Sequence, residues 1–392
     1  MKKIIASIFI LFCVCGCWNY KELNEYSIVT GIAIDKKDDK FEVSTLISNA
    51  PKNSTDSSSS ESQIVVYSGT GDSMLEALKD VGLISPKELY LNSFSIIVIS
   101  EEVAKEGIDS VIDFFLRYSS SRNKFYVIVA REDKAKDVLK IMTHLTNFPS
   151  QSISDNLKST KNLQGIITAT NFDELTLTIL RDGIDLVINS IYVVGDVEEG
   201  SSTENLESSE PKSYIKIGNL GIFKGDKLVD WTTHNESLGI NIINNDISEM
   251  YLNIEYKDGY VVVDTTSFSS NIKTSVKNDK PVVDINLKGE ARIIEVKGDV
   301  DLQDEKVIEE LQNKCNDLIK SDVNEAIDVA IENKSDIFGF GLKFYQNYPN
   351  YYKKVKDNWE DELENIKFII KRDLTLKNKV SSKNSLEETY DK

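Results

Sequence analysis

The chain has 392 residues, of which 40% are apolar and 28% are charged, and this composition is typical of a globular protein with two or three domains. Its formal net charge of -18 argues against nucleic acid as a partner, because phosphate backbones would repel it. The same charge repels anionic lipid headgroups, so membrane association would need an anchor other than a basic face.

Residues 1–16 are predicted to be a lipoprotein signal peptide. Lys2 and Lys3 precede an apolar run over residues 4–12, which is about half the ~20 residues that a spanning helix needs. Gly16 supplies the small residue required before a cleavage site at Cys17. Without this segment the chain would hold 44 basic and 64 acidic residues, a charge of -20.

Cys13, Cys15 and Cys17 crowd into five positions, which raises the alternatives of a metal site, a redox pair or a lipid attachment site. The spacing C-x-C-x-C matches no common structural zinc pattern, and no histidine lies near it. "VCGC" resembles a bacterial lipobox, with mild departures at Val14 and Cys15. We therefore expect Cys17 to be acylated, and two or three acyl chains at about 0.8 kcal/mol per buried methylene would anchor the protein firmly.

The expected N-terminal domain covers residues 17–195. Alternation of apolar residues predicts strands, and apolar spacing of three to four residues predicts helices. The predicted strands are 25–35, 40–48, 63–69, 89–100 and 124–130, and the predicted helices are 72–82, 101–118 and 132–142. Residues 50–62 are predicted to be a polar loop, and only one strand, 185–195, is predicted after residue 149. The β-α-β-α-β order favours a mixed sheet covered by helices.

Residues 196–213 are acidic and rich in serine, and we expect a linker there, followed by a C-terminal domain over 214–392. Strands are predicted at 213–231, with a turn at Gly225 and Asp226, and at 250–267, 281–296 and 365–376. A long amphipathic helix is predicted over 304–333, with Cys315 on its apolar stripe. The predicted class is α+β and multi-domain, with a mixed sheet and helices first and an antiparallel sheet packed on a long helix second.

No catalytic pattern is recognisable in the sequence. The two histidines, His144 and His234, are far apart, and neither a nucleophile elbow nor a phosphate-binding loop occurs. The stretch 68–73, "SGTGDS", is only a weak glycine-rich turn before a helix. Acidic clusters are expected to be solvated helix faces, because no EF-hand spacing is present. We therefore expect no enzyme activity, no cofactor and no metal.

The expected mature N-terminus reads "CWNYKELNEYSIVTGIAID", and "GDSMLEALKD", "NLGIFKGDKLVDW" and "KSDIFGFG" follow it along the chain. Together these motifs resemble the Ger(x)C family, the lipoprotein C subunits of nutrient germinant receptors in spores. The N-terminal motif resembles the start of that family, the second its next helix and the third the opening of its second domain, and "KSDIFGFG" is the most specific match. The matching residues are Cys17, Trp18, Glu22, Val29, Gly31, Ile32, Ile34, Asp35, Ser335, Asp336, Phe338, Gly339, Phe340 and Gly341. Residues 54–62 and the acidic stretch near 200 depart from the family pattern.

The resemblance implies a non-enzymatic subunit that is tethered by its lipid to the outer face of the spore inner membrane. It further implies two integral-membrane partner subunits and a complex that nutrients trigger. For "SDIFGFG" two interpretations stay open. In the structural one, Ser335 or Asp336 caps a helix, Gly339 permits a turn and the phenylalanines fill the core. In the other, the motif is a docking surface for a membrane partner.

Two other classes of protein are alternatives to a receptor subunit. A lipid-anchored solute-binding protein of a transporter should have two similar doubly wound lobes, whereas the second half of this chain is predicted to be antiparallel and to contain a long helix. An anchored hydrolase should have a nucleophile motif, and none is recognisable.

Overall fold

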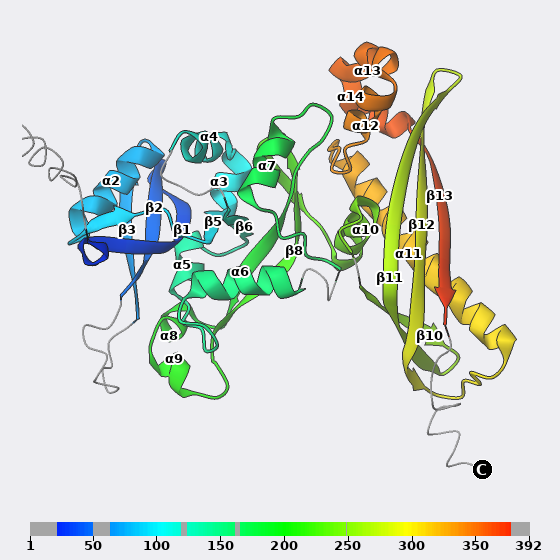
Figure 1. Cartoon of the computed structure of the whole chain (residues 1–392), viewed down its shortest axis with the longest axis horizontal. Helices are drawn as coiled ribbons and strands as arrows, with labels where there is room; N and C mark the ends of the chain where they lie inside the picture. The colour runs from blue at the N-terminus through cyan, green and yellow to red at the C-terminus, as the bar shows by residue number, and fades with distance from the viewer. Residues whose placement is uncertain (1–21, 50–62, 119–123, 161–164, 248, 378–392) are drawn as a thin grey trace, which may run out of the picture.

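The computed structural model describes residues 22–49, 63–118, 124–160, 165–247 and 249–377. These residues form two domains that lie one after the other along the longest axis of the molecule (Figure 1). The expected signal peptide, Cys17 and Trp18 lie outside the described residues. Among the described helices, none is both long enough and apolar enough to cross a membrane.

Within the described residues, the first domain is built on a nine-stranded mixed sheet with the order β3-β2-β1-β5-β6-β7-β8-β9, and β4 pairs with β1. The strands from β1 through β5 and β6 to β7 run parallel, and antiparallel pairs extend the sheet on both sides. The strands are β1 (Tyr26–Lys37), β2 (Lys40–Ser48), β3 (Ile64–Gly71), β4 (Glu88–Tyr90), β5 (Ile96–Ser100), β6 (Tyr126–Ala130), β7 (Val187–Val194), β8 (Tyr214–Lys224) and β9 (Lys227–Trp231).

Helices cover both faces of this sheet, because successive strand residues point to opposite sides and both sets are apolar. Ile97 and Ile99 of β5 belong to one apolar cluster, whereas Ile96 and Val98 belong to the other. The helices of the first domain are α2 (Met74–Ile84), α3 (Glu101–Glu106), α4 (Asp109–Arg117), α5 (Ala135–Lys140), α6 (Pro149–Thr160), α7 (Phe172–Ile179), α8 (Val197–Gly200) and α9 (Glu204–Glu207), and the short 3₁₀ turn η1 (Leu23–Glu25) precedes β1.

The second domain packs a four-stranded sheet, counted over the described residues, against one long helix. The predicted α+β class is therefore confirmed, as is the long helix, in which Cys315 is buried. The order is β10-β11-β12-β13, and β13 joins β12 in parallel while the other pairs are antiparallel. The expectation of a purely antiparallel sheet is therefore wrong for its last strand. The elements are β10 (Tyr251–Tyr256), β11 (Gly259–Lys277), β12 (Lys280–Lys297), α11 (Glu305–Glu332), α12 (Phe340–Asn347), α13 (Pro349–Val355), α14 (Trp359–Glu362) and β13 (Lys367–Leu376).

Helix α10 (His234–Asn244) joins the two domains. It begins after β9 with a capping box between Thr233 and Glu236, and it packs against α11. Gly239 lies where the two helices cross, because a Cβ atom there would collide with the backbone oxygen of Asp322. A single apolar cluster runs from the first sheet through α10 to α11. Such a shared core restricts relative motion of the domains.

Several predicted elements differ in detail. The predicted helix 101–118 is two helices, because Gly107 adopts a φ of 130° and ends α3. The predicted strand 89–100 is divided between β4 and β5. Helices α6 and α7 were not predicted. In α6 the buried positions include Ser150 and Ser154, so its packed face does not show up as apolar periodicity.

The expected linker at 196–213 requires a correction. This segment connects β7 to β8, which are antiparallel neighbours in the first sheet, and it contains α8 and α9. Asn205 in α9 is buried and donates hydrogen bonds to the carbonyl oxygens of Met142 and Ser213. Strands β8 and β9 thus extend the N-terminal sheet and do not open a separate domain. An acidic, serine-rich composition predicts exposure to solvent, but it does not predict which of the flanking strands will pair.

Candidate functional site

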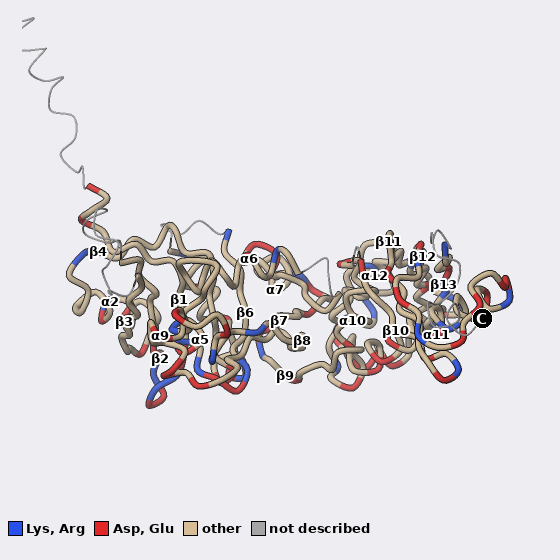
Figure 2. Tube along the Cα trace, turned by 90° about the horizontal axis from the view of Figure 1, so that it is seen from below, with Lys and Arg blue, Asp and Glu red and all other residues tan. Residues whose placement is uncertain are grey.

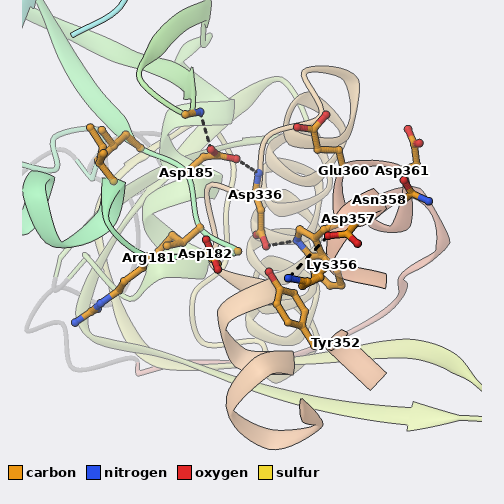
Figure 3. Close-up of a pocket in the computed structure, with 16 residues that line it drawn as sticks. Arg181, Asp182, Asp185, Asp336, Tyr352, Lys356, Asp357, Asn358, Glu360 and Asp361 are labelled. Atoms are coloured by element: carbon orange, nitrogen blue, oxygen red, sulfur yellow. Dashed lines mark hydrogen bonds and ion pairs between the residues drawn. The ribbon is translucent and has the colours of Figure 1, made fainter. Parts of the chain in front are cut away.

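A cleft of about 520 Å³ lies at the junction of the two domains (Figure 3). One wall is the segment 179–186 between α7 and β7, and the other is formed by α13, α14 and the 3₁₀ turn between them. Asp336, from the motif "SDIFGFG", lies in this cleft and is 2% exposed. The motif therefore lies at the contact between the halves of the protein.

Asp336 organises the start of α12. Its Oδ1 accepts a hydrogen bond from the backbone nitrogen of Phe340 at 2.9 Å, and its Oδ2 accepts one from the backbone nitrogen of Gly341 at 2.6 Å. Oδ2 also accepts a bond from Trp359 Nε1 at 2.8 Å. The first N–H groups of a helix have no partner within the helix, so a carboxylate placed here satisfies them. The same carboxylate joins α12 to α14.

The backbone of Asp336 pairs with Asp185 of the first domain. Asp336 N donates to Asp185 Oδ2 at 2.8 Å, and Asp185 N donates to the carbonyl oxygen of Asp336 at 2.9 Å. Asp185 Oδ1 accepts a bond from Gly225 N at 2.9 Å, and Ser335 Oγ donates to the carbonyl oxygen of Phe223 at 2.6 Å. The segment just before β7, the β8–β9 hairpin and the segment just after α11 are thereby held together.

Two glycines allow the domains to approach closely. A Cβ atom on Gly183 would lie 2.7 Å from the backbone carbon of Gly341, and a Cβ atom on Gly341 would lie 2.8 Å from Gly183 Cα. Leu342 N donates to the carbonyl oxygen of Gly183 at 2.9 Å. Gly183 has a φ of 76°, which also favours glycine. We name these contacts, together with those of Asp185, Ser335 and Asp336, the interdomain clasp.

The phenylalanines of the motif belong to the core. Phe338 and Phe340 are buried, with ring centroids 5.1 Å apart, and Phe340 also contacts Phe368 of β13 at 5.5 Å. Gly339 has a φ of 65°, and a Cβ atom there would lie 2.9 Å from Ile184 Cδ1. The motif side chains therefore make their contacts within the chain.

The electrostatics of the cleft are dominated by carboxylates (Figure 3). Burial raises the pKa of Asp336 to about 6, against the opposing effect of its three N–H donors. At the rim, Lys334 Nζ pairs with Asp361 at 2.6 Å, and Lys224 pairs with Glu360. Since the three N–H donors already engage both oxygens of Asp336, this carboxylate is suited to holding backbone elements in place.

Asp35, at the end of the N-terminal motif, has a comparable role on the other side of the first domain. Its two oxygens accept hydrogen bonds from the backbone nitrogens of Ala135 and Lys136 at 2.8 and 3.0 Å, at the start of α5. Burial raises its pKa to about 6. A Cβ atom on Gly31 would lie 3.1 Å from Ser150 Cβ, so this glycine lets α6 approach β1.

The remaining candidates do not gather at the clasp. His144 is exposed, and its Nε2 lies 2.9 Å from the carbonyl oxygen of Ser208, whereas His234 is the first residue of α10. Within the described residues, no three His, Cys, Asp or Glu side chains are arranged to hold a metal ion. Cys17 lies outside the described residues, so the lipid attachment site remains a prediction.

Sequence reasoning missed the partners of the motif, which are Gly183, Asp185, Phe223 and Trp359. They lie 112 to 158 positions before, or 23 positions after, the motif residues that they contact, so no local pattern connects them. The Asp-Gly pair at 182–183 signals a turn, but it gives no indication of what the turn meets.

The fold and the clasp define a class of protein, a two-domain α+β body whose halves are joined by a shared core and buried hydrogen bonds. The family model described as "Spore germination protein N-terminal domain" matches residues 19–193, and the model "Spore germination B3/ GerAC like, C-terminal" matches residues 218–379. The chain therefore belongs to the GerAC-like spore germination protein family, the C subunits of germinant receptors.

Curated relatives match over nearly the full length. The chain is 27% identical to spore germination protein KC of Bacillus subtilis and 23% identical to spore germination protein B3 of the same organism. The first match covers 92% of both chains, and the second covers 92% of this chain and 93% of the relative. The crystal structure of the GerBC protein has the same fold, with a TM-score of 0.57 at 18% identity, and the match covers 91% of this chain and 99% of that one.

Proposed function

We propose that this protein is the lipid-anchored, non-enzymatic subunit of a nutrient germinant receptor complex that spores require to germinate. The observation that carries the proposal is the family match over both domains, which extends along 92% of the chain and of its relative. The lipobox at Cys17 supports attachment of the body to the outer face of the spore inner membrane.

The alternative of a solute-binding protein of a transporter finds less support. Over the described residues, one domain has nine strands with helices on both faces and the other has four strands beside a single long helix. A transporter protein of that kind would place its ligand between two similar doubly wound lobes. The cleft here lies between unlike domains that share a core and are held by the interdomain clasp.

We further propose that "SDIFGFG" is structural and that partner subunits dock elsewhere. The support is the burial of Ser335, Asp336, Phe338 and Phe340, whose side chains make their contacts inside the chain. Two polytopic subunits would be held by other surfaces, which crosslinking in intact spore membranes would identify.

A deletion strain tests the function. Its spores should fail to germinate on the nutrient while vegetative growth is unchanged, and the wild-type gene should restore germination. A Cys17→Ala variant should appear in the soluble fraction and fail to restore it, whereas Cys315→Ala is the matched cysteine control. Normal germination of the deletion strain, with no paralogue present, would refute the proposal.

Membrane attachment and assembly are tested separately. Mass spectrometry of the native protein should find a lipid on the Cys17 sulfur. The protein should co-fractionate with two polytopic proteins from spore membranes. An unmodified Cys17 would refute the anchor, and purification without polytopic partners would refute the complex.

A further inference from the structure

Three large apolar side chains are exposed on two segments that meet beside the start of β1, at one end of the first domain. Leu83 and Ile84, at the end of α2, are 86% and 52% exposed, and Leu23 in η1 is 67% exposed. Single exposed apolar residues are common on soluble proteins, but grouped ones mark interaction surfaces. We name these three residues the apolar tip.

The segments that carry the apolar tip are joined by hydrogen bonds. Ser27 Oγ, just after η1, lies 2.9 Å from Ser85 Oγ, which directly follows Ile84. Ser85 Oγ also contacts the carbonyl oxygen of Lys87 at 2.7 Å. Strand β4 then pairs in parallel with the first residues of β1. The tip is therefore a defined surface held by the edge of the sheet.

The apolar tip lies where the described chain begins. Figure 2 shows β4 and α2 at one end of the elongated molecule, beside the first described residues, and the second domain at the opposite end. Only five residue steps separate Cys17 from Glu22. Whatever their conformation, five residues span at most about 18 Å. A lipid on Cys17 would consequently hold this end, and not the second domain, close to the bilayer.

We propose that the apolar tip enters the bilayer surface, at the boundary between headgroups and acyl chains, and so fixes the orientation of the whole body. This inference rests on the proposed lipid anchor. The occupant is lipid, because the anchor brings a bilayer within reach of the tip. The exposed Lys79 and Lys87 flank the tip and can extend toward headgroup phosphates.

Insertion at this end is shallow. Glu88 is exposed beside the tip, and a carboxylate remains in water. The apolar faces of interfacial helices enter a bilayer by about 5–10 Å. A side chain at the end of α2 can reach that depth while Glu88 stays in the headgroup layer. Two points of attachment, the lipid and the tip, would stop the body from swinging freely about a single tether.

Spin labels in the native, acylated protein test this proposal. A nitroxide is attached to Leu83→Cys in liposomes of phosphatidylcholine and phosphatidylglycerol, and relaxation by oxygen is compared with relaxation by a water-soluble nickel chelate. The buried Cys315 should not compete for the label. The reference is the same labelled protein after a lipase has released it from the liposomes into detergent-free buffer. Relative to that reference, we expect the label on the membrane-bound protein to be severalfold more accessible to oxygen and severalfold less accessible to the nickel chelate.

Two leucine controls keep the test specific. Leu180→Cys, at a position 72% exposed beside the interdomain cleft, should remain open to the nickel chelate. Leu75→Cys is 45% exposed and lies at the other end of α2, eight residues or about 12 Å away, so it should be less immersed than Leu83→Cys.

The outcomes separate the tip from the anchor. Protein that fails to float with liposomes refutes the lipid anchor. Two outcomes would overturn the tip proposal and leave the anchor intact. In both, the protein floats with the liposomes. In the first, the label on Leu83→Cys stays in water, and in the second, protein shields that label from both reagents. Equal immersion at Leu180→Cys would also overturn the tip proposal. Leu83→Glu should keep flotation, through the lipid, while raising the nickel accessibility of a label on Ile84→Cys.

Discussion

Asp185 and Asp336 exchange hydrogen bonds across the domain junction, with Asp336 N donating to Asp185 Oδ2 at 2.8 Å and Asp185 N donating to the carbonyl oxygen of Asp336 at 2.9 Å. Asp185 lies two residues before β7 of the first domain, and Asp336 follows α11 of the second. Two carboxylates can lie together here because each accepts hydrogen bonds from N–H groups. The family motif thus joins the domains as well as starting a helix.

Removing the Asp336 carboxylate should destabilise the protein. Asp336→Ala leaves three buried N–H groups without acceptors, so we expect a loss of about 3 kcal/mol or more in the free energy of unfolding. Urea denaturation followed by tryptophan fluorescence measures it. Asp361→Ala is the control, because Asp361 is 67% exposed and its pair with Lys334 should contribute less than about 1 kcal/mol. Equal urea midpoints for the two variants would contradict the role given to Asp336.

Three glycine variants separate steric contact from backbone strain. Gly183→Ala introduces both a contact at 2.7 Å and an unfavourable φ, so it should be strongly destabilising. Gly225→Ala introduces only a φ of 59°, with open space around it, and should cost about 1 kcal/mol. Gly82→Ala, in α2 with open space, should stabilise by about 0.5–1 kcal/mol. Thermal melts rank them, and a Gly183→Ala protein as stable as Gly225→Ala would argue against close packing at the clasp.

Stability should fall as the pH rises from about 4 to 7. Burial raises the pKa of Asp322 from 3.8 to about 7 and that of Asp336 to about 6. A carboxyl group with a raised pKa binds its proton more tightly in the folded protein. Its contribution to stability is therefore complete below pH 3.8 and is lost as the pH rises through the folded pKa.

Asp322→Asn should flatten this pH dependence and raise the denaturation midpoint at pH 8 relative to the wild type. Asp328→Asn, at an exposed position on the same helix α11, is the matched control and should leave the slope unchanged. The measurement is the urea midpoint at intervals between pH 4 and pH 8. A wild-type midpoint that rises across this window would show that the sign assigned to Asp322 is wrong.

The Cys315 thiol should be inert in the folded protein. It is fully buried, and burial raises its pKa to about 12, so the reactive thiolate is scarce. A thiol reagent should modify it only after urea unfolds the chain, with a rate that follows unfolding. Leu180→Cys supplies an exposed thiol as the positive control. Rapid modification of Cys315 in the native protein would contradict its place in the core.

The sequence by itself determined most of the local structure. The β1–β2 hairpin, α2, the buried strand β6, the β8–β9 hairpin and the long helix α11 were all predicted, because their periods of two or 3.6 residues are properties of neighbouring residues. The motif around Asp336 was also recognised from its residues. The prediction that Ser335 or Asp336 caps the following helix rested on the hydrogen-bonding chemistry of Ser and Asp side chains.

The tertiary structure alone decided which of these segments meet. Strand β8 pairs with β7 across the acidic segment 196–213, and β13 adds to β12 in parallel. Asp336 reaches Asp185 across 151 positions. The period of apolar residues and the local composition describe the surface of one helix or strand. Which strands pair depends instead on the buried surfaces and unpaired N–H groups that remain once the whole chain has collapsed. Those surfaces and groups are set by residues distant in the sequence.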